Sequence, residues 1–450
     1  MAQAHSPGKT ARPAIGRLSA PKVPHIAEQR LTGGVPALIA RHSGVPLAEL
    51  RVAFPLREKE LTNPAPVTVL CGALFAGTAR HDRTALAEAL EELGAHLDVA
   101  VHDDHLVLSG SVLATNLASF LSLVCEMLTA AAYPKAEVRA DARRAADEAL
   151  LALAQPEVIA RQELRRRLFK GHPYATPMAS PGALRRVNDD ALHELHRAVL
   201  RASVPVVVMV GDLPPSRAKA LLEDHLGPWL ATRKRPVAAL APLPEYQHGP
   251  IEIVARPNAV QSNIRLGGSA PPFSAPDWPA TNLAESIAGG MFTSRMVANL
   301  RERNGYTYTP YTVTRHARAG SYVAAAADVA TGVTAPALVE TIYELGRLAA
   351  TGVTAEELEL ARHYALGRFS FQVATQSGLA STVVALAARG SGTSYLKSYP
   401  KALLAATKDE VDEAAKRYLA PGRLVTVVVG DPTVIGPQLS LLGDVIVRKA

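Results

Sequence analysis

The sequence is poor in cysteine, in aromatic side chains and in long apolar runs. Of its 450 residues only two are cysteines and 5% are aromatic. Cys71 and Cys125 each stand inside an apolar segment, which predicts buried, reduced thiols rather than a disulfide framework and favours a cytoplasmic location. The apolar stretches 204–210 and 322–327 fall well short of the roughly 18 residues that a membrane-spanning helix needs. We therefore expect a chain that does not cross a bilayer.

Common catalytic and nucleotide-binding signatures are also missing. The sequence has no G-x-x-x-x-G-K-[ST] loop, no G-x-G-x-x-G after a strand and no G-x-S-x-G elbow. None of the 14 histidines begins H-E-x-x-H or H-x-x-E-H, the two helical zinc signatures of metallopeptidases. These absences weigh against nucleotide binding, common hydrolase mechanisms and an autonomous zinc peptidase.

Acidic residues are absent from the first 27 positions. That stretch carries +4 of the formal net charge of +7, from Lys9, Arg12, Arg17 and Lys22. Its four prolines would break an amphipathic helix, so we expect a disordered basic arm over residues 1–33. The rest of the chain is nearly balanced in charge and has no basic helix or zinc-finger spacing, which argues against nucleic-acid binding.

The two halves of the chain repeat each other. The segment Val206-Val-Val-Met-Val-Gly-Asp212 recurs as Thr426-Val-Val-Val-Gly-Asp431, with the aspartates 219 residues apart. Nearly the same offset relates two further pairs of segments, 134–138 with 354–358 and 188–192 with 407–411. With 48% hydrophobic residues the chain can build sizeable cores, so a gene duplication that yields two similar lobes is the simplest interpretation.

A proline-rich stretch, residues 231–250, divides the repeats, because proline at this density prevents a helix and stiffens a linker. We predict an N-terminal lobe at 34–230 and a C-terminal lobe at 251–450. The first half predicts strands within 37–54, a helix over 84–93, and a hairpin of 97–101 with 106–112. Each lobe is thus expected to be α+β, a mainly antiparallel sheet with helices on one face, and the cleft between lobes is a natural ligand site.

Two histidine pairs have ligand-like spacing. His102-Asp-Asp-His105 lies between two predicted strands, and His193 and His196 are three residues apart on a predicted helix. Both spacings can bind zinc. The simpler interpretations are a polar hairpin tip for the first pair and a solvated helix face for the second.

The second half holds a glycine pair and an arginine–tyrosine pair. Gly289-Gly290 predicts a helix break or a close backbone contact. Asn304-Gly305 should stop the next helix, so that Tyr308 follows in a strand. On these residues alone, Arg301 is best explained as a cation that complements the helix dipole, and Tyr308 as a ring half-buried on a sheet face.

Taken in order, these segments resemble the insulinase-like, or pitrilysin, zinc peptidases, a family that includes the mitochondrial processing peptidase and short bacterial relatives. The resemblance runs from about Gly34 to Asp431 and rests on Ala73–Thr78, Leu90–Gly94, Gly171–Tyr174, Asn258–Leu266, Ala284–Gly290, Thr293–Arg295, Leu300–Glu302 and Gly305–Tyr308. It implies a duplicated metallohydrolase-like fold and a role in cleaving peptides.

The family's zinc motif is degenerate in this chain. Where the family has H-x-x-E-H, this sequence reads Thr68-Val-Leu-Cys71-Gly72. The third family ligand, a glutamate on a later helix, falls near Glu148 or its neighbour Asp147, and Glu148 is more simply a solvated helix residue. Because a catalytic site needs three protein ligands, we expect no catalytic zinc in this chain.

The resemblance also implies a partner. In two-chain family members, one subunit carries the zinc motif and the other supplies an arginine–tyrosine pair, here Arg301 and Tyr308. The chain would then be the non-zinc subunit of a heterodimer, with zinc in a homologous partner and with Gly289 and Gly290 beside the peptide. The alternative is an inactive scaffold or peptide-binding protein of the core-subunit type. A third possibility, a zinc enzyme built on His102, His105, His193 or His196, is disfavoured by their spacing.

Overall fold

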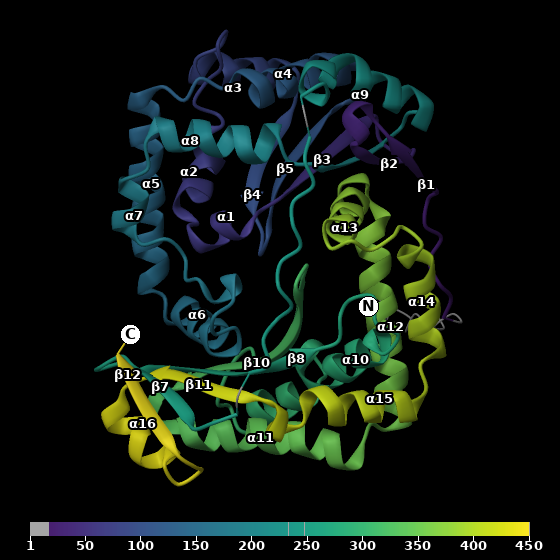
Figure 1. Ribbon diagram of the computed structural model, residues 1–450. Helices are drawn as coiled ribbons and strands as arrows, with labels where there is room; N and C mark the ends of the chain where they lie inside the picture. The colour runs from purple at the N-terminus through teal and green to yellow at the C-terminus, as the bar shows by residue number, and fades with distance from the viewer. Residues whose placement is uncertain (1–17, 233, 247, 450) are drawn as a thin grey trace, which may run out of the picture.

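The computed structural model describes residues 18–232, 234–246 and 248–449. It shows two lobes, the first half of the chain above and the second half below in Figure 1. Each lobe contains one six-stranded sheet, in the order β1-β2-β6-β3-β5-β4 and β12-β7-β11-β8-β10-β9. Five strands take equivalent places in the two sheets, but the edge strands differ: β1 precedes β2 and pairs with it antiparallel, whereas β12 ends the chain and pairs with β7 in parallel. The predicted α+β class and the internal duplication are confirmed.

Both sheets are mainly antiparallel. The first consists of β1 (Ile26–Arg30), β2 (Pro36–Arg41), β3 (Leu47–Pro55), β4 (His96–Val101), β5 (His105–Leu113) and β6 (Val206–Gly211). The second consists of β7 (Ile251–Ala255), β8 (Gln261–Ala270), β9 (Tyr311–Ala317), β10 (Gly320–Ala330), β11 (Val425–Gly430) and β12 (Val445–Lys449). Only β2 with β6, β11 with β7, and β12 with β7 run parallel.

Helices flank both sheets. In the first half they are α1 (Glu58–Thr62), α2 (Ala65–Ala73), α3 (Arg83–Glu92), α4 (Leu117–Ala130), α5 (Lys135–Ala154), α6 (Pro156–Leu168), α7 (Pro181–Arg185), α8 (Asp189–Leu195), η4 (His196–Arg201) and α9 (Pro215–Leu230). In the second half they are α10 (Trp278–Glu285), η5 (Ser286–Gly290), η6 (Val297–Arg303), α11 (Thr334–Thr351), α12 (Ala355–Ala374), α13 (Gln376–Ala388), α14 (Tyr395–Ala405), α15 (Lys408–Ala414), η8 (Ala415–Leu419) and α16 (Pro432–Leu439). The predicted hairpin is the β4–β5 pair, and the predicted helix over 84–93 is α3.

The lobes interlock by exchanging one helix each. Helix α13 of the second half packs on β3 and β6, and α6 of the first half packs on β8 and β11. The two helices begin at Pro156 and Gln376, 220 residues apart, so they occupy equivalent places in the repeats. The single-faced helix layer predicted from sequence is therefore incomplete, because each sheet also receives a helix from the other lobe.

Strand β6 is apolar throughout because both of its faces are buried. Val207 and Met209 belong to the core of their own lobe. Val208 and Val210, which point to the opposite face because side chains alternate along a strand, pack in a cluster with Leu379 of α13. A strand covered on both faces has no polar side, and β11 repeats the arrangement between its own core and α6.

The expected disordered arm over residues 1–33 was wrong at its C-terminal end, while residues 1–17 lie outside the described residues. Residues 26–30 form strand β1, because they pair in register with β2. Upstream of β1, Val23 packs in the cluster formed by α13 and Leu18 contacts the core of the second lobe. This segment therefore descends from the first lobe to the second along the right edge of Figure 1.

The stretch predicted as a linker contains no helix or strand in its described part. It contacts both lobes, since Ala241 O lies 3.0 Å from Nε2 of His172 and the Tyr246 hydroxyl donates to Arg423 O.

Within the described ranges no single helix has the length and apolarity to cross a membrane. The consecutive helices α12 and α13 reach that length and apolarity only when taken together, and they are bent by 107° at their junction.

Candidate functional site

Arg301 and Tyr308 lie side by side on the second lobe. The Arg301 guanidinium carbon is 4.7 Å from the centre of the Tyr308 ring and 4.7 Å from the centre of the Phe292 ring. Both rings are exposed, Tyr308 to 79% and Phe292 to 68%, whereas the Arg301 side chain is 27% exposed. The Nε of Arg301 lies 3.2 Å from a carboxylate oxygen of the neighbouring Glu302, so the terminal NH₂ groups are the donors that remain for a ligand.

Buried polar contacts hold the helical turn that carries Arg301. The Asn299 amide donates to Glu340 and Glu344 of α11, both at 2.7 Å. Arg295, one turn earlier, donates to both carboxylate oxygens of Glu357 at 2.7 and 2.8 Å. These bonds connect the first half of η6, and the residues just before it, to α11 and α12, which restrains the helix that carries Arg301.

The environment of Tyr308 differs from the sequence-based expectation. The helix does stop at Asn304-Gly305, where Gly305 takes the left-handed φ of 63°. However, the strand begins only at Tyr311, so Tyr308 stands on a loop, and its ring is exposed rather than half-buried on a sheet. Phe292 was missed, because nothing local in the sequence links it to an arginine nine positions later.

Gly289 and Gly290 end the helix that precedes Phe292. A Cβ on Gly289 would lie 2.7 Å from the backbone nitrogen of Thr312 in β9, which no side chain tolerates. A Cβ on Gly290 would lie 3.3 Å from the backbone oxygen of Glu285. The structure thus confirms the close backbone contact expected of this pair, and the helix end places Phe292 over Arg301.

The degenerate zinc positions lie on α2. Thr68 is exposed and its hydroxyl donates to Pro64 O at 3.0 Å. Burial raises the pKa of the half-buried Cys71 thiol to about 12, and this thiol is the single soft ligand among the five motif positions. Gly72 supplies no side chain. The donors of α2 therefore do not fit the zinc site that the resemblance implies.

The carboxylate opposite Gly72 is Asp141, not Glu148. Asp141 is buried on α5, and its oxygens accept from Arg83 at 2.7 Å and Arg144 at 2.9 Å. Glu148, one of the two remnant candidates, is exposed on the same helix, as is its neighbour Asp147, which pairs with Arg185 at 3.0 Å. Among the described residues no three His, Cys, Asp or Glu side chains are grouped to hold a metal ion.

His196 does not lie on a solvated helix face, as the sequence had suggested. It is buried, with Nδ1 2.7 Å from the Tyr133 hydroxyl and Nε2 2.9 Å from Leu128 O. These partners indicate a neutral ring that donates through Nε2 and accepts at Nδ1. Burial lowers the pKa of His196 to about 4.

This histidine predicts a loss of stability in mild acid. Its pKa is about 4 in the folded chain and about 6.5 when unfolded, so the unfolded chain binds more protons as the pH falls below 6.5. At pH 5 the cost is roughly 2 kcal/mol of unfolding free energy. Urea unfolding at pH 7.5 and pH 5 should show a smaller pH effect for H196Q than for the unmodified chain. H193Q, on the same helical segment, is the control and should keep the full pH effect.

The His102–His105 turn is not simply a polar hairpin tip, because Asp104 is fully buried. Its carboxylate lies 2.9 Å from Nδ1 of His105 and accepts from the Tyr174 hydroxyl. It also accepts from the backbone N–H of Arg318 at 2.7 Å, which belongs to the β9–β10 turn of the second lobe. Asp104 thus joins the two lobes through their equivalent hairpins.

Hydrogen bonding outweighs burial at this carboxylate. Burial alone would raise the pKa of Asp104, but the bonds from His105, Tyr174 and Arg318 lower it to about 2. Arg318 in turn donates to Leu56 O of the first lobe at 2.5 Å. The aspartate is therefore ionised, and it serves as a structural connection between lobes rather than as a metal ligand.

The duplicated, interlocked lobes and the degenerate motif define a peptidase-like scaffold. The chain matches "Insulinase (Peptidase family M16)" over residues 70–182 and "Peptidase M16 inactive domain" over residues 186–364. It belongs to the insulinase family, peptidase family M16.

Sequence relatives and solved structures agree with this assignment. The chain is 22% identical over 241 residues to an uncharacterized zinc protease of Mycobacterium leprae and 23% identical over 241 residues to one of Mycobacterium tuberculosis. Each match covers 53% of this chain. It spans about half of each relative, 54% of the first and 55% of the second. The fold matches a peptidase M16 inactive domain from Pseudomonas fluorescens with a TM-score of 0.81 at 22% identity, covering 90% of this chain and 98% of that one. The periplasmic protease PqqL from Escherichia coli matches with a TM-score of 0.74 at 17% identity, covering 93% of this chain and 48% of that one.

Proposed function

We propose that this chain is the non-zinc subunit of a two-chain metallopeptidase that cleaves peptides or small precursors. The observation that carries the proposal is the contact between Arg301, on helix η6, and the exposed Tyr308, on the loop that follows it, in a chain whose own motif positions do not fit a zinc ion. A homologous partner with an intact H-x-x-E-H motif would contain the zinc and supply the activated water. Gly289 and Gly290 shape the segment beside this pair.

The two side chains suit different parts of peptide hydrolysis. The terminal NH₂ groups of Arg301 can donate to backbone carbonyl oxygens of a substrate, because its Nε is paired with Glu302 and its guanidinium carbon lies against two aromatic rings. The exposed Tyr308 hydroxyl can donate to the oxyanion that forms when water attacks an amide. Donors placed before the reaction need no reorganisation, which is why such groups lower the barrier.

Reconstitution tests the proposal. This chain and a zinc-motif relative from the same organism are purified separately, and cleavage of a quenched fluorescent peptide is measured for each chain and for the mixture, with zinc content. We expect zinc with the relative and the highest rate in the mixture. The control mixture contains a relative whose motif glutamate is changed to glutamine. If mixing yields neither a complex nor a faster rate, the chain is an inactive scaffold or peptide-binding protein, the alternative favoured by its lost zinc ligands.

Replacing Phe292 by alanine removes one of the two rings that hold Arg301. Cation–π contacts at exposed sites contribute about 0.5–1 kcal/mol, so F292A should raise the KM of the reconstituted complex roughly two- to fivefold. The thermal midpoint should barely change, because Phe292 is largely exposed. F371A is the matched control, since Phe371 is 82% exposed on α12, away from Arg301 in the sequence and in a different helix. An unchanged KM in F292A would separate this ring from substrate binding.

A further inference from the structure

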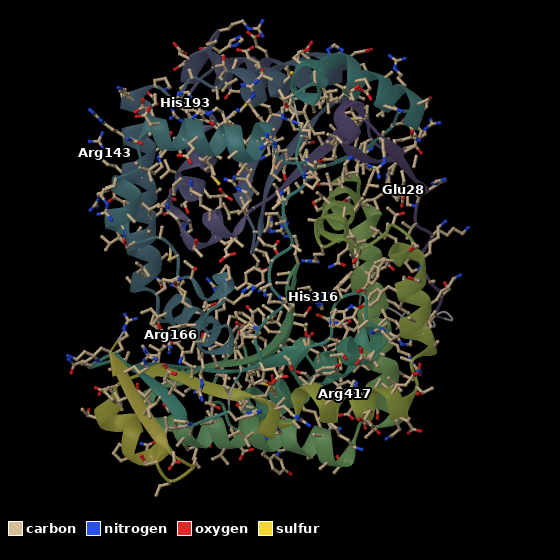
Figure 2. The ribbon with its side chains drawn as sticks, viewed as in Figure 1. Glu28, Arg143, Arg166, His193, His316 and Arg417 are labelled. Atoms are coloured by element: carbon tan, nitrogen blue, oxygen red, sulfur yellow. The ribbon has the colours of Figure 1, made fainter. Side chains whose placement is uncertain are left out.

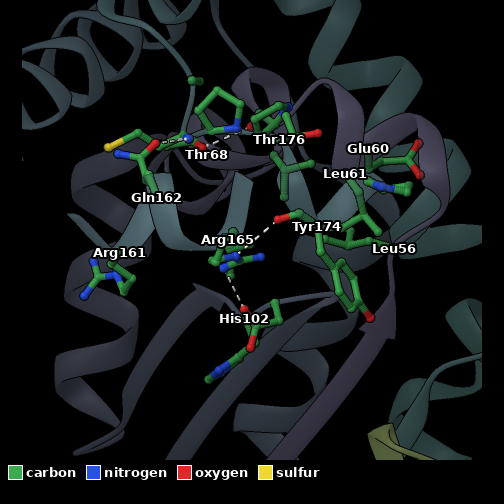
Figure 3. A pocket seen from close by; sticks show the side chains of 18 of the residues that line it. Leu56, Glu60, Leu61, Thr68, His102, Arg161, Gln162, Arg165, Tyr174 and Thr176 are labelled. Atoms are coloured by element: carbon green, nitrogen blue, oxygen red, sulfur yellow. Dashed lines mark hydrogen bonds and ion pairs between the residues drawn. The ribbon is translucent and has the colours of Figure 1, made fainter. Parts of the chain in front are cut away.

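A pocket of about 500 Å³ opens beside the degenerate zinc helix, within the range of roughly 300–1,000 Å³ that is usual for ligand sites. Helix α6, helix α2, the β4–β5 turn and the segment around 173–179 enclose it (Figure 3). Thr68, the first of the five motif positions, lines this pocket. The site therefore lies where the metal ligands of the motif have been lost.

Most of the wall is apolar. It is formed by Leu56, Leu61, Pro64, Val67, Val101, Ala152, Val158, Pro173, Pro177, Met178 and Ala179. Such a wall favours an apolar side chain, because each square ångström of apolar surface removed from water contributes about 25 cal/mol.

Hydrogen-bond donors gather at one side of the pocket, on α6. Arg161 and Arg165 are four residues apart and so share one helix face. Arg165 uses Nε for Tyr174 O at 3.2 Å and Nη1 for Asp103 at 2.9 Å, and no described residue accepts from its Nη2. Gln162 accepts from the Met178 backbone N–H at 2.9 Å through Oε1, which leaves its NH₂ group as a donor.

The acidic groups of the lining are already engaged. Glu60 accepts from Arg57 at 2.9 Å, and Asp103 pairs with Arg165. Arg161 has only a loose contact of 3.8 Å with Glu157, with both side chains more than half exposed. The Arg161 guanidinium is therefore held, among the described residues, only by a long, solvent-exposed ion pair with Glu157, which a ligand carboxylate can replace.

We propose that this pocket binds a carboxylate of a peptide together with a neighbouring apolar side chain. A guanidinium fork matches a carboxylate in shape and charge, Gln162 and Arg165 supply further donors, and the apolar wall takes the adjacent side chain. The carboxylate can be the C-terminus of a peptide or an acidic side chain beside an apolar one. The inference is independent of the proposed function, because it concerns neither Arg301 nor Tyr308 and needs no partner.

Binding of short peptides to the full chain alone tests this inference. Three fluorescein-labelled hexapeptides share their first four residues and all end in leucine. The first has a free C-terminal carboxylate, the second has the same sequence with a C-terminal amide, and the third is also amidated but has glutamate at position five. Fluorescence anisotropy measures each Kd. If the free acid binds at least tenfold more tightly than its amide, the pocket binds a C-terminal carboxylate. If the amidated glutamate peptide binds as tightly as the free acid, the pocket also binds a carboxylate on a side chain. Equal binding of all three peptides, or binding of none, overturns the proposal.

Two variants localise the binding. R161Q should raise the Kd of the carboxylate peptide roughly tenfold or more, the usual effect of losing a charge-assisted hydrogen bond. The Kd of the amidated peptide should not change. T68F, which fills the pocket from an exposed position, should raise the Kd of every peptide that binds. The control is R143Q, because Arg143 is an exposed arginine on the outer side of α5 that does not line the pocket (Figure 2). If R161Q and R143Q behave alike, the pocket is not the binding site.

Discussion

Replacing Tyr308 by phenylalanine is expected to lower the turnover of the reconstituted two-chain complex about a hundredfold, the usual effect of removing one oxyanion donor. The ring that stacks on Arg301 is kept, and only the hydroxyl is lost. Because Tyr308 is 79% exposed on a loop, folding and assembly should not change. Steady-state rates with the quenched peptide, together with gel filtration of the complex, measure both effects.

The pattern of kinetic constants distinguishes the two members of the pair. Y308F should lower kcat with little change in KM, since an oxyanion donor acts only in the transition state. R301K should raise KM, because lysine lacks the planar fork that grips carbonyl oxygens. Y343F is the matched control, since Tyr343 is also exposed, at 54%, on α11. A fully active Y308F complex would exclude Tyr308 from the active site and leave the pair without a catalytic role.

Replacing Asp104 by asparagine should destabilise the chain by about 3 kcal/mol, the lower end of what breaking a buried charge cluster costs. The change leaves Arg318 without the carboxylate that it approaches and replaces an acceptor of several hydrogen bonds by an amide. Because these bonds connect two lobes, the unfolding transition should also lose cooperativity. Urea unfolding followed by fluorescence measures the change in midpoint.

The neighbouring residue provides a control in the same turn. Among the described residues Asp103 pairs with Arg165 alone, at 2.9 Å, and its side chain is 35% exposed, so D103N should cost well under 1 kcal/mol. The sign of the pH effect is also determined. The folded pKa of Asp104 is about 2 and the unfolded value about 3.9, so its contribution is complete above pH 4 and is lost as the pH falls toward 2. If D104N were as stable as D103N, the connection between lobes would lie elsewhere.

Local patterns predicted the elements that depend on neighbours in sequence. The hairpin of β4 and β5 and the helix α3 follow from alternation and from period 3.6 within a few residues. Asp82 caps α3 by accepting from the Ala85 N–H at 2.9 Å, a contact between close positions. The stop at Gly305 was likewise predictable, because a left-handed conformation favours glycine.

Polar residues were predicted less well. An aspartate in a hairpin turn and a histidine on a charged helix are usually exposed, and nothing near Asp104 or His196 in the sequence indicates otherwise. Their burial is compensated by partners far along the chain: Arg318 is 214 residues from Asp104, and Tyr133 is 63 residues from His196. A buried polar group is tolerated only where such partners exist, so its location depends on the assembled fold.

The sequence by itself determined the duplication, the class of the fold and the loss of the zinc ligands, because these are matters of residue identity and spacing. The tertiary structure alone decided that α6 and α13 cross between lobes, that Arg301 contacts both Phe292 and Tyr308, and that Arg161 and Arg165 line a pocket beside Thr68. Those features arise from contacts between distant segments, whose geometry is set by the packing of whole sheets and helices rather than by any local pattern.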